Sequence, residues 1–182
     1  MFSKIRYSIG ERSLRKKAHQ VTRTRQVHNF KTCRNAAILY DATKAEDFSP
    51  VKEFMKFLNS ISIKTDLIGY VNGDLIHSNL LLWENCYFFC RKDLNLFYKP
   101  KPPVFKEFLT RKFDILFDLS IADHYPLRYL STLAAADFKV GSYKEGEFVP
   151  DFMIDVRKQP ELVYLIDQIK VYVDRLNNPD AT

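Results

Sequence analysis

The chain alternates between short continuous apolar runs and longer segments whose apolar residues recur every three or four positions. The continuous runs predict buried strands, and the longer segments predict amphipathic helices with one face toward a core. The predicted strands cover 36–40, 64–71, 86–90, 113–120, 138–143 and 152–156. The predicted helices cover 49–60, 104–112, 126–136 and 160–177, and a further short helix is predicted at 75–83.

Two of these helices have clear start signals. Ser49 is placed to cap the first one, with Pro50 at its first helical position. Pro160 marks the start of the last one, which carries a single apolar stripe. The stripe consists of Leu162, Leu165, Ile166, Ile169, Val173 and Leu176.

The alternation of strands with helices determines the expected fold class. Connections of this kind are right-handed crossovers, which produce a mainly parallel sheet covered by helices on both faces. We therefore expect an α/β fold, a three-layer Rossmann-like sandwich with a mostly parallel sheet of five or six strands. It would form one domain at 36–178, followed by a short tail at 179–182 and preceded by an arm at 1–35.

The arm reads as a basic helix. Residues 3–28 contain no proline, and Ile5, Ile9, Leu14, Ala18 and Val21 form an imperfect apolar stripe. The single glycine of this segment, Gly10, predicts a break or bend. A short isolated helix rarely overcomes its nucleation cost, so we expect the stripe to dock on the body or on a partner.

Composition adds a charge asymmetry to this picture. Hydrophobic residues make up 46% of the 182 positions, which excludes a disordered protein for most of the length. The net charge is +6, but residues 1–35 carry ten lysines or arginines against one acid, Glu11, giving +9. The remaining residues therefore sum to −3, and the basic character belongs to the arm.

Dense positive charge favours binding to phosphates, because each neutralised phosphate releases counterions. His19, His28, Asn29 and Phe30 add groups that stack on bases or hydrogen-bond to them. A solvated tail, an acidic protein partner and an anionic membrane surface are the alternatives, although the arm lacks the Trp, Phe and Leu face that membrane insertion favours. The predicted nucleic-acid-binding residues are Arg12, Arg15, Lys16, Lys17, Arg23, Arg25, Lys31 and Arg34.

Several chemistries are not expected. With five glycines the chain has neither the dinucleotide-binding nor the P-loop glycine pattern, so we expect no nucleotide cofactor. Cys33, Cys86 and Cys90 have no framework spacing and indicate core thiols in a reducing, cytoplasmic setting. His77 and His124 lack paired-ligand spacing, so no metal site is predicted. No apolar run reaches the roughly 20 residues of a membrane span, and no secretory signal is recognisable.

Ligands of such sheets bind outside the carboxyl ends of the strands. Asp41 ends the first predicted strand, and Asp118, Ser120 and His124 follow the "FDILF" run, residues 113–117, of the strand at 113–120. A carboxylate and a histidine at this edge suit acid–base work, whereas Asp and Ser at strand ends more often cap turns. We treat these four as ligand-facing candidates and predict no catalytic residue.

The stretch "FDILFDLSIADHYPLRYLSTLAAADFKVG", Phe113 to Gly141, resembles the N-terminal domain of heptosyltransferase-type glycosyltransferases. The resemblance implies the same strand–helix–strand packing. It carries no activity over, because the chain is half the length of the two-domain enzyme and lacks its glycine–aspartate loop. The basic arm and the segments "ILYD", "FDILFDLS", "KVGSY" and "FMIDV" make the whole chain similar to an uncharacterised family of small bacterial cytosolic proteins, which implies a domain of unknown function.

Together these features predict a non-enzymatic, RNA-associated protein that binds through its basic arm. Ribosomal RNA and ribosomal proteins are the candidate partners. The alternatives are a single-domain or degenerate glycosyltransferase-like enzyme, which would use Asp41 or Asp118, and an interaction module that docks on an acidic partner.

Overall fold

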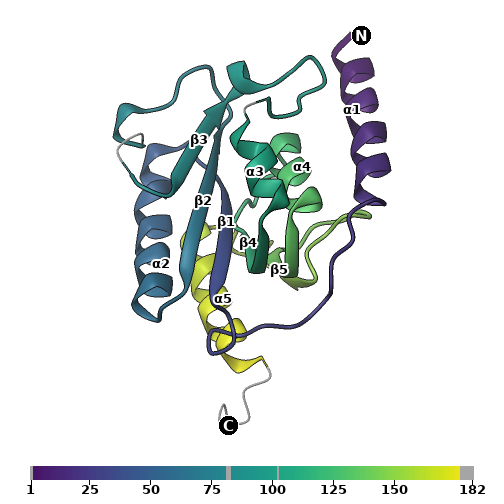
Figure 1. Ribbon diagram of the computed structural model, residues 1–182. Coiled ribbons are helices and arrows are strands. Elements are labelled where there is room, and N and C mark those ends of the chain that lie inside the picture. Colours follow the sequence, from purple (N-terminus) through teal and green to yellow (C-terminus); the bar gives the residue numbers. More distant parts are fainter. Residues whose placement is uncertain (1, 81–82, 102, 177–182) are drawn as a thin grey trace.

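The protein is built around a six-stranded sheet, shown by a computed structural model that describes residues 2–80, 83–101 and 103–176 (Figure 1). The strand order is β3-β2-β1-β4-β5-β6, and every neighbouring pair is parallel. The predicted α/β fold with a mainly parallel sheet is therefore confirmed. The strands are β1 (Asn35–Asp41), β2 (Lys64–Val71), β3 (Cys86–Cys90), β4 (Lys112–Asp118), β5 (Ala135–Ser142) and β6 (Phe152–Ile154).

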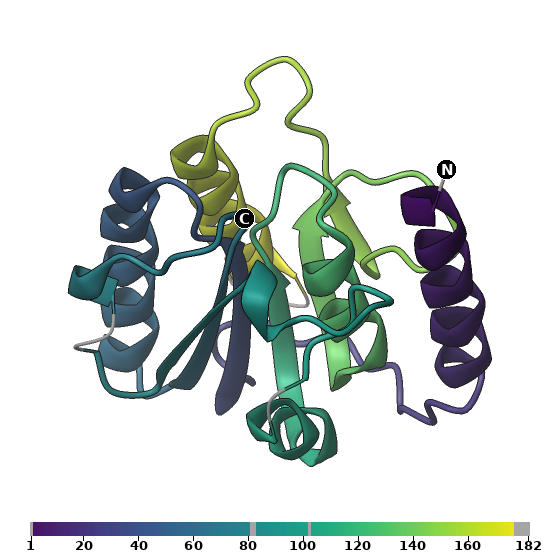
Figure 2. The same ribbon diagram turned by 90° about the horizontal axis from the view of Figure 1, so that it is seen from above.

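Helices cover both faces of the sheet and complete the three layers. One buried cluster joins α2 and α5 to the sheet, and a second joins α1, α3 and α4 to the opposite face. Seen from above, α1 lies at the periphery beyond α4 (Figure 2). No helix in the described part of the chain is long and apolar enough to span a membrane. The helices are α1 (Phe2–Ala18), α2 (Phe48–Ser60), α3 (Val104–Thr110), α4 (Tyr125–Leu133) and α5 (Leu162–Arg175).

The strand order creates one switch point, between β1 and β4. From β1 the chain moves through β2 to β3 at one edge, then returns to β4 and continues outward through β5 to β6. Crossovers leave the two central strands in opposite directions, which opens a crevice at their carboxyl ends. Asp41 ends β1 and Asp118 ends β4, so both border this crevice.

Some predicted element boundaries are wrong. The helix expected to reach residue 136 ends at Leu133, and β5 begins at Ala135, where it pairs with Lys112 of β4. Strand pairing here overrides the helix preference of alanine. Earlier in the chain, α2 already begins at Phe48 after a 3-10 turn, so Ser49 and Pro50 lie inside its first turns and Ser49 is not the cap.

Of two further helix predictions, the helix at 75–83 is wrong and the apolar stripe of α5 is confirmed. Only a 3-10 turn, Ser78–Leu80, forms in the segment predicted as a helix at 75–83, of which residues 81–82 lie outside the described part. In α5 the predicted stripe is confirmed, because its central residues are buried. These are Leu165, Ile166, Ile169 and Val173.

The arm packs against the body by the second half of the predicted stripe, since Leu14 lies in the buried cluster and Ala18 and Val21 pack against it. Leu14 is fully buried, whereas the side chains of Ile5 and Ile9 are about half exposed. Helix α1 runs unbroken through Gly10, where an added Cβ would lie 2.7 Å from the Phe97 carbonyl oxygen. Gly10 thus permits close approach of two segments and does not bend the helix.

The segment after α1 also belongs to the packed body. It runs beneath the lower end of the sheet to reach β1 (Figure 1). Phe30 and Cys33, which lie on it, are buried in the same cluster as α2 and α5. Packing therefore crosses the boundary that we expected at residue 35.

Candidate functional site

Helix α1 is fastened to α4 by polar contacts along one side. The Arg128 guanidinium donates to both carboxylate oxygens of Glu11, at 2.5 and 3.2 Å, and to the Tyr7 hydroxyl at 2.6 Å. Lys17 Nζ donates to the Tyr129 hydroxyl at 2.9 Å. These contacts fix the rotation of α1 about its own axis, and hence which residues face the solvent.

The opposite side of α1 is basic and exposed. Among the described residues, Arg6, Arg12 and Lys16 have no hydrogen-bond or ion-pair partner. Arg15 is 65% exposed, and its Nε lies 3.8 Å from a carboxylate oxygen of Glu147, a loose contact at a solvated position. Helix α1 therefore presents a row of cations on a fixed support.

Arg23 has a different environment from the other predicted binding residues. Its guanidinium forms a bidentate pair with Asp151, at 2.6 and 2.7 Å, and also donates to the Ala136 carbonyl oxygen at 3.1 Å. The side chain is only 12% exposed, so it holds the arm to the start of β5. Arg25 lies 3.7 Å from the same carboxylate but is 77% exposed.

A second group of cations lies at the lower edge of the sheet, where the strands begin. Lys31 and Arg34 are exposed there, together with Lys64 and Lys112, which sequence reasoning did not select. The Lys64 amide donates to the Arg34 carbonyl oxygen at 2.9 Å, so these two residues adjoin. Their position could have been inferred from the sequence. All strands of a parallel sheet begin at the same edge, so the residues at and just before the strand starts lie close together there.

Three groups expected to contact bases are instead buried. His28, Asn29 and Phe30 are each less than a tenth exposed. The Asn29 side-chain amide donates to the Leu176 carbonyl oxygen at 2.7 Å, and the Phe30 ring packs edge-on against Phe57 at 5.3 Å. These three side chains anchor the segment before β1. Of the four residues expected to contact bases, only His19 is exposed.

The four candidates at the strand ends fall into two separate pairs. Asp41 and His124 meet at the switch point, with 2.8 Å between Asp41 Oδ2 and His124 Nε2. Burial tends to raise the pKa of Asp41, but hydrogen bonds from His124 and Thr43 outweigh it and hold the pKa below its usual value. Both residues line an open cavity of about 590 Å³, and His124 also lines a second one of about 420 Å³; the two cavities share His124 and Asn72.

Asp118 and Ser120 form the other pair, which is buried. Lys144 Nζ donates to Asp118 Oδ2 at 2.8 Å and to Ser120 Oγ at 2.9 Å, and the Ser120 hydroxyl also donates to Asp118. Burial tends to raise the pKa of Asp118, but the Lys144 charge and these hydrogen bonds keep the pKa below its usual value. The arrangement ties the end of β4 to the chain after β5.

The three cysteines are free thiols, and Cys86 and Cys90 pack toward the same side of the sheet. Burial raises the pKa of Cys33 to about 12 and that of Cys86 to about 11. Cys33 and Cys90 are buried core residues, as predicted, and Cys86 is partly buried against the same cluster. The turn after β1 carries Asp41, Glu46 and Asp47 and no glycine, so it offers no cradle for a diphosphate.

A family model described as a family of unknown function, DUF6913, matches residues 6–176 of the chain. No curated protein and no solved structure matches the chain.

Proposed function

We propose that this chain, which belongs to the DUF6913 family of unknown function, is a non-enzymatic protein that binds RNA. The binding surface is the row of exposed cations on α1, continued along the segment that leads to β1 and the lower edge of the sheet. We call this surface the basic tract. It consists of Arg12, Arg15, Lys16, Lys17, Arg25, Lys31, Arg34 and Lys64.

The observation that carries the proposal is the orientation of α1. Its buried side holds Leu14 and Glu11 against the body, so Arg12 and Lys16 point outward with no acidic partner in the part of the chain that the structure describes. Cations held on a docked helix lose little conformational freedom when they meet phosphates. Their binding energy comes from the release of counterions, which requires density of charge and no base-specific geometry.

The shape of the tract favours RNA over a membrane surface. Helix α1 exposes Ile5 and Ile9, whereas a helix that inserts into lipid presents a broad face rich in Trp, Phe and Leu. The cations also continue beyond the helix to Lys31 and Arg34 on an irregular segment. The phosphate backbone of a folded RNA can contact cations along such an irregular path. Ribosomal RNA and ribosomal proteins in the cytoplasm are the partners that we propose.

Charge reversal is the appropriate test, since removal of the arm would also remove Leu14, Phe30 and Cys33 from the core. Arg12→Glu/Lys16→Glu is compared with Lys106→Glu/Lys158→Glu, which changes the net charge equally at exposed sites outside the tract. Fluorescence polarisation with a labelled ribosomal RNA stem–loop measures affinity. We expect the first variant to lose about tenfold or more and the second to lose little.

The salt dependence provides a further measurement. With six to eight phosphate contacts, the affinity of the unmodified chain falls by roughly 10³-fold or more between 50 and 200 mM salt. Absence of RNA binding at low salt, or equal losses in both variants, would overturn the proposal. Binding to anionic vesicles but not to RNA would also overturn it, in favour of a membrane-surface protein.

A second candidate function rests on Asp41 and His124. Their contact at the switch point, between two cavities, suits acid–base chemistry on a bound ligand, as in a single-domain relative of heptosyltransferase-type enzymes. The acidic turn after β1 disfavours a sugar nucleotide. If this second function holds, a sugar nucleotide should raise the melting temperature of the unmodified chain and of Arg12→Glu/Lys16→Glu. It should not raise the melting temperature of Asp41→Asn.

A further inference from the structure

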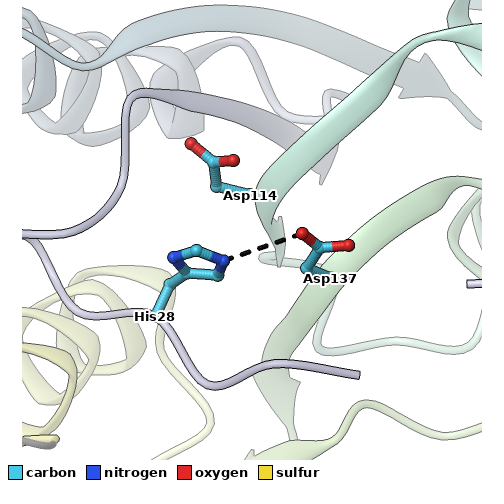
Figure 3. A group of neighbouring side chains, drawn as sticks. All are labelled: His28, Asp114 and Asp137. Carbon is cyan, nitrogen blue, oxygen red and sulfur yellow. Dashed lines mark ion pairs between the residues drawn. The ribbon is translucent and has the colours of Figure 1, made fainter. Parts of the chain in front are cut away.

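Three side chains from distant parts of the sequence meet at the lower end of the sheet: His28, Asp114 and Asp137 (Figure 3). Asp114 lies on β4 and Asp137 on β5, and the flanking partners in the register place the two residues opposite each other. His28 comes from the segment between α1 and β1, and the Nε2 edge of its ring points toward Asp137. One candidate ligand atom from each side chain lies within 4.8 Å of the other two.

Two atoms of this group lack partners although they are buried. His28 Nε2 and Asp137 Oδ1 have no hydrogen-bond partner among the described residues, and both side chains are more than nine-tenths buried. His28 Nε2 lies 3.7 Å from Asp137 Oδ2, which is too long for a hydrogen bond. A buried polar atom without a partner is costly, so the group as it stands is incomplete.

The remaining atoms of the group are already oriented by neighbours. Thr32 Oγ1 lies 3.3 Å from His28 Nδ1, the ring nitrogen that faces away from Asp137. Asp114 Oδ2 accepts hydrogen bonds from the backbone amides of Arg34, at 2.7 Å, and Asn35, at 3.1 Å. Such outer contacts fix the ligands of a metal and leave the inward atoms available to it.

One cation already approaches the group from outside. Lys112 Nζ lies 3.2 Å from Asp137 Oδ2, but its side chain is 68% exposed. Because its ammonium is largely solvated, Lys112 can swing away into solvent when a metal ion takes over the neutralisation of Asp137. Lys112 is therefore a competitor for the site and does not close it.

We propose that His28, Asp114 and Asp137 bind a zinc ion, through His28 Nε2 and one oxygen of each carboxylate. A neutral imidazole with two carboxylates is a donor set that suits Zn²⁺, whereas Mg²⁺ and Ca²⁺ prefer oxygen ligands alone. Bonds of about 2.0–2.2 Å require the three ligand atoms to draw closer together than they lie here. Rotations of the side chains supply this movement, and a water completes the tetrahedron.

The ion would have a structural effect that is independent of RNA. It would join the segment that carries His28 to the starts of β4 and β5, beside Arg34 of the basic tract. Metal binding that is confined to the folded state raises stability in proportion to the logarithm of the metal concentration. The full-length chain should therefore melt at a higher temperature with Zn²⁺ than with a chelator.

The test uses the full-length chain, freed of metal by a chelator and without RNA. Isothermal titration with Zn²⁺ should give one site, and Co²⁺ in its place should give the visible absorption of a tetrahedral complex. Asp137→Asn and His28→Gln should lose at least tenfold in affinity. His19→Gln, which changes an exposed histidine of the same arm, is the matched control and should bind as the unmodified chain does.

Lys112→Gln keeps the test decisive if the ligand variants fold poorly. Removal of the competing ammonium should tighten Zn²⁺ binding several-fold, a gain that misfolding cannot imitate. Mg²⁺ should not displace Zn²⁺. Absence of Zn²⁺ binding at millimolar excess, equal affinity in Asp137→Asn, or identical melting temperatures with Zn²⁺ and chelator would overturn the proposal and leave a plain His28–Asp137 ion pair.

Discussion

Arg128 of α4 forms a bidentate ion pair with Glu11 of α1, with nitrogen–oxygen distances of 2.5 and 3.2 Å. Glu11 is the one acidic residue among the first 35, so the lone acid of the basic arm is its anchor. The same guanidinium also contacts the Tyr7 hydroxyl at 2.6 Å and Asp123 at 3.0 Å. The basic tract therefore depends on a pair of residues that lies outside it.

Loss of this pair should loosen α1. Glu11→Gln removes a mostly buried charge, 21% exposed, from beside Arg128, and we expect the free energy of unfolding to fall by about 1–3 kcal/mol. Hydrogen exchange should show α1 amides losing protection before the sheet does. Arg12→Gln, at the neighbouring exposed position, is the control. Unchanged protection of α1 in Glu11→Gln would show that the pair does not hold the helix.

Gly10→Ala should destabilise the protein, although alanine is the better helix former by about 1 kcal/mol. The added methyl group would lie 2.7 Å from the Phe97 carbonyl oxygen and 3.0 Å from the Tyr125 hydroxyl, and overpacking of this kind costs about 1–3 kcal/mol. Urea unfolding measures the change. Ser8→Ala, on the exposed side of the same helix, should be neutral or slightly stabilising, and a stabilising Gly10→Ala would contradict the close packing.

Asp118→Asn should lower stability in a pH-dependent manner. The folded state depresses the pKa of this carboxyl. Its contribution to stability is therefore complete at pH values above the pKa in the unfolded chain, about 4, and is lost as pH falls through the lower pKa of the folded state. At pH 7 the variant leaves Lys144 without its buried partner, which costs about 3–5 kcal/mol. The gap between variant and unmodified chain should narrow in acid.

Urea unfolding at several pH values measures this gap. Asp155→Asn, which removes an exposed carboxylate paired with Arg157, is the control and should show little effect. A gap for Asp118→Asn that stays constant down to low pH would contradict the depressed pKa. Affinity for RNA at pH 7 should not change in the folded variant, because Asp118 is buried and does not belong to the basic tract.

Sequence patterning was informative where structure is local or periodic. Continuous apolar runs predicted the strands because the inner strands of a parallel sheet are buried on both faces. The stripe of α5 predicted its buried side, with Leu165 and Ile169 among the residues that it covers. The boundary between α4 and β5 was wrong, because Ala135 and Ala136 follow the pairing with β4 against their local preference.

The charge partition and the α/β class were thus determined by the sequence alone, since both depend on composition and on the period of the apolar residues. Tertiary structure decided which residues meet. Ile9 belonged to the expected stripe yet is exposed, and Gly10 is buried in its place, because the docking angle of α1 is set by packing and by Glu11. Strand register and crossovers brought Asp41 to His124 and His28 to Asp137. The spacing of apolar residues along the sequence cannot predict contacts between residues so far apart in the chain.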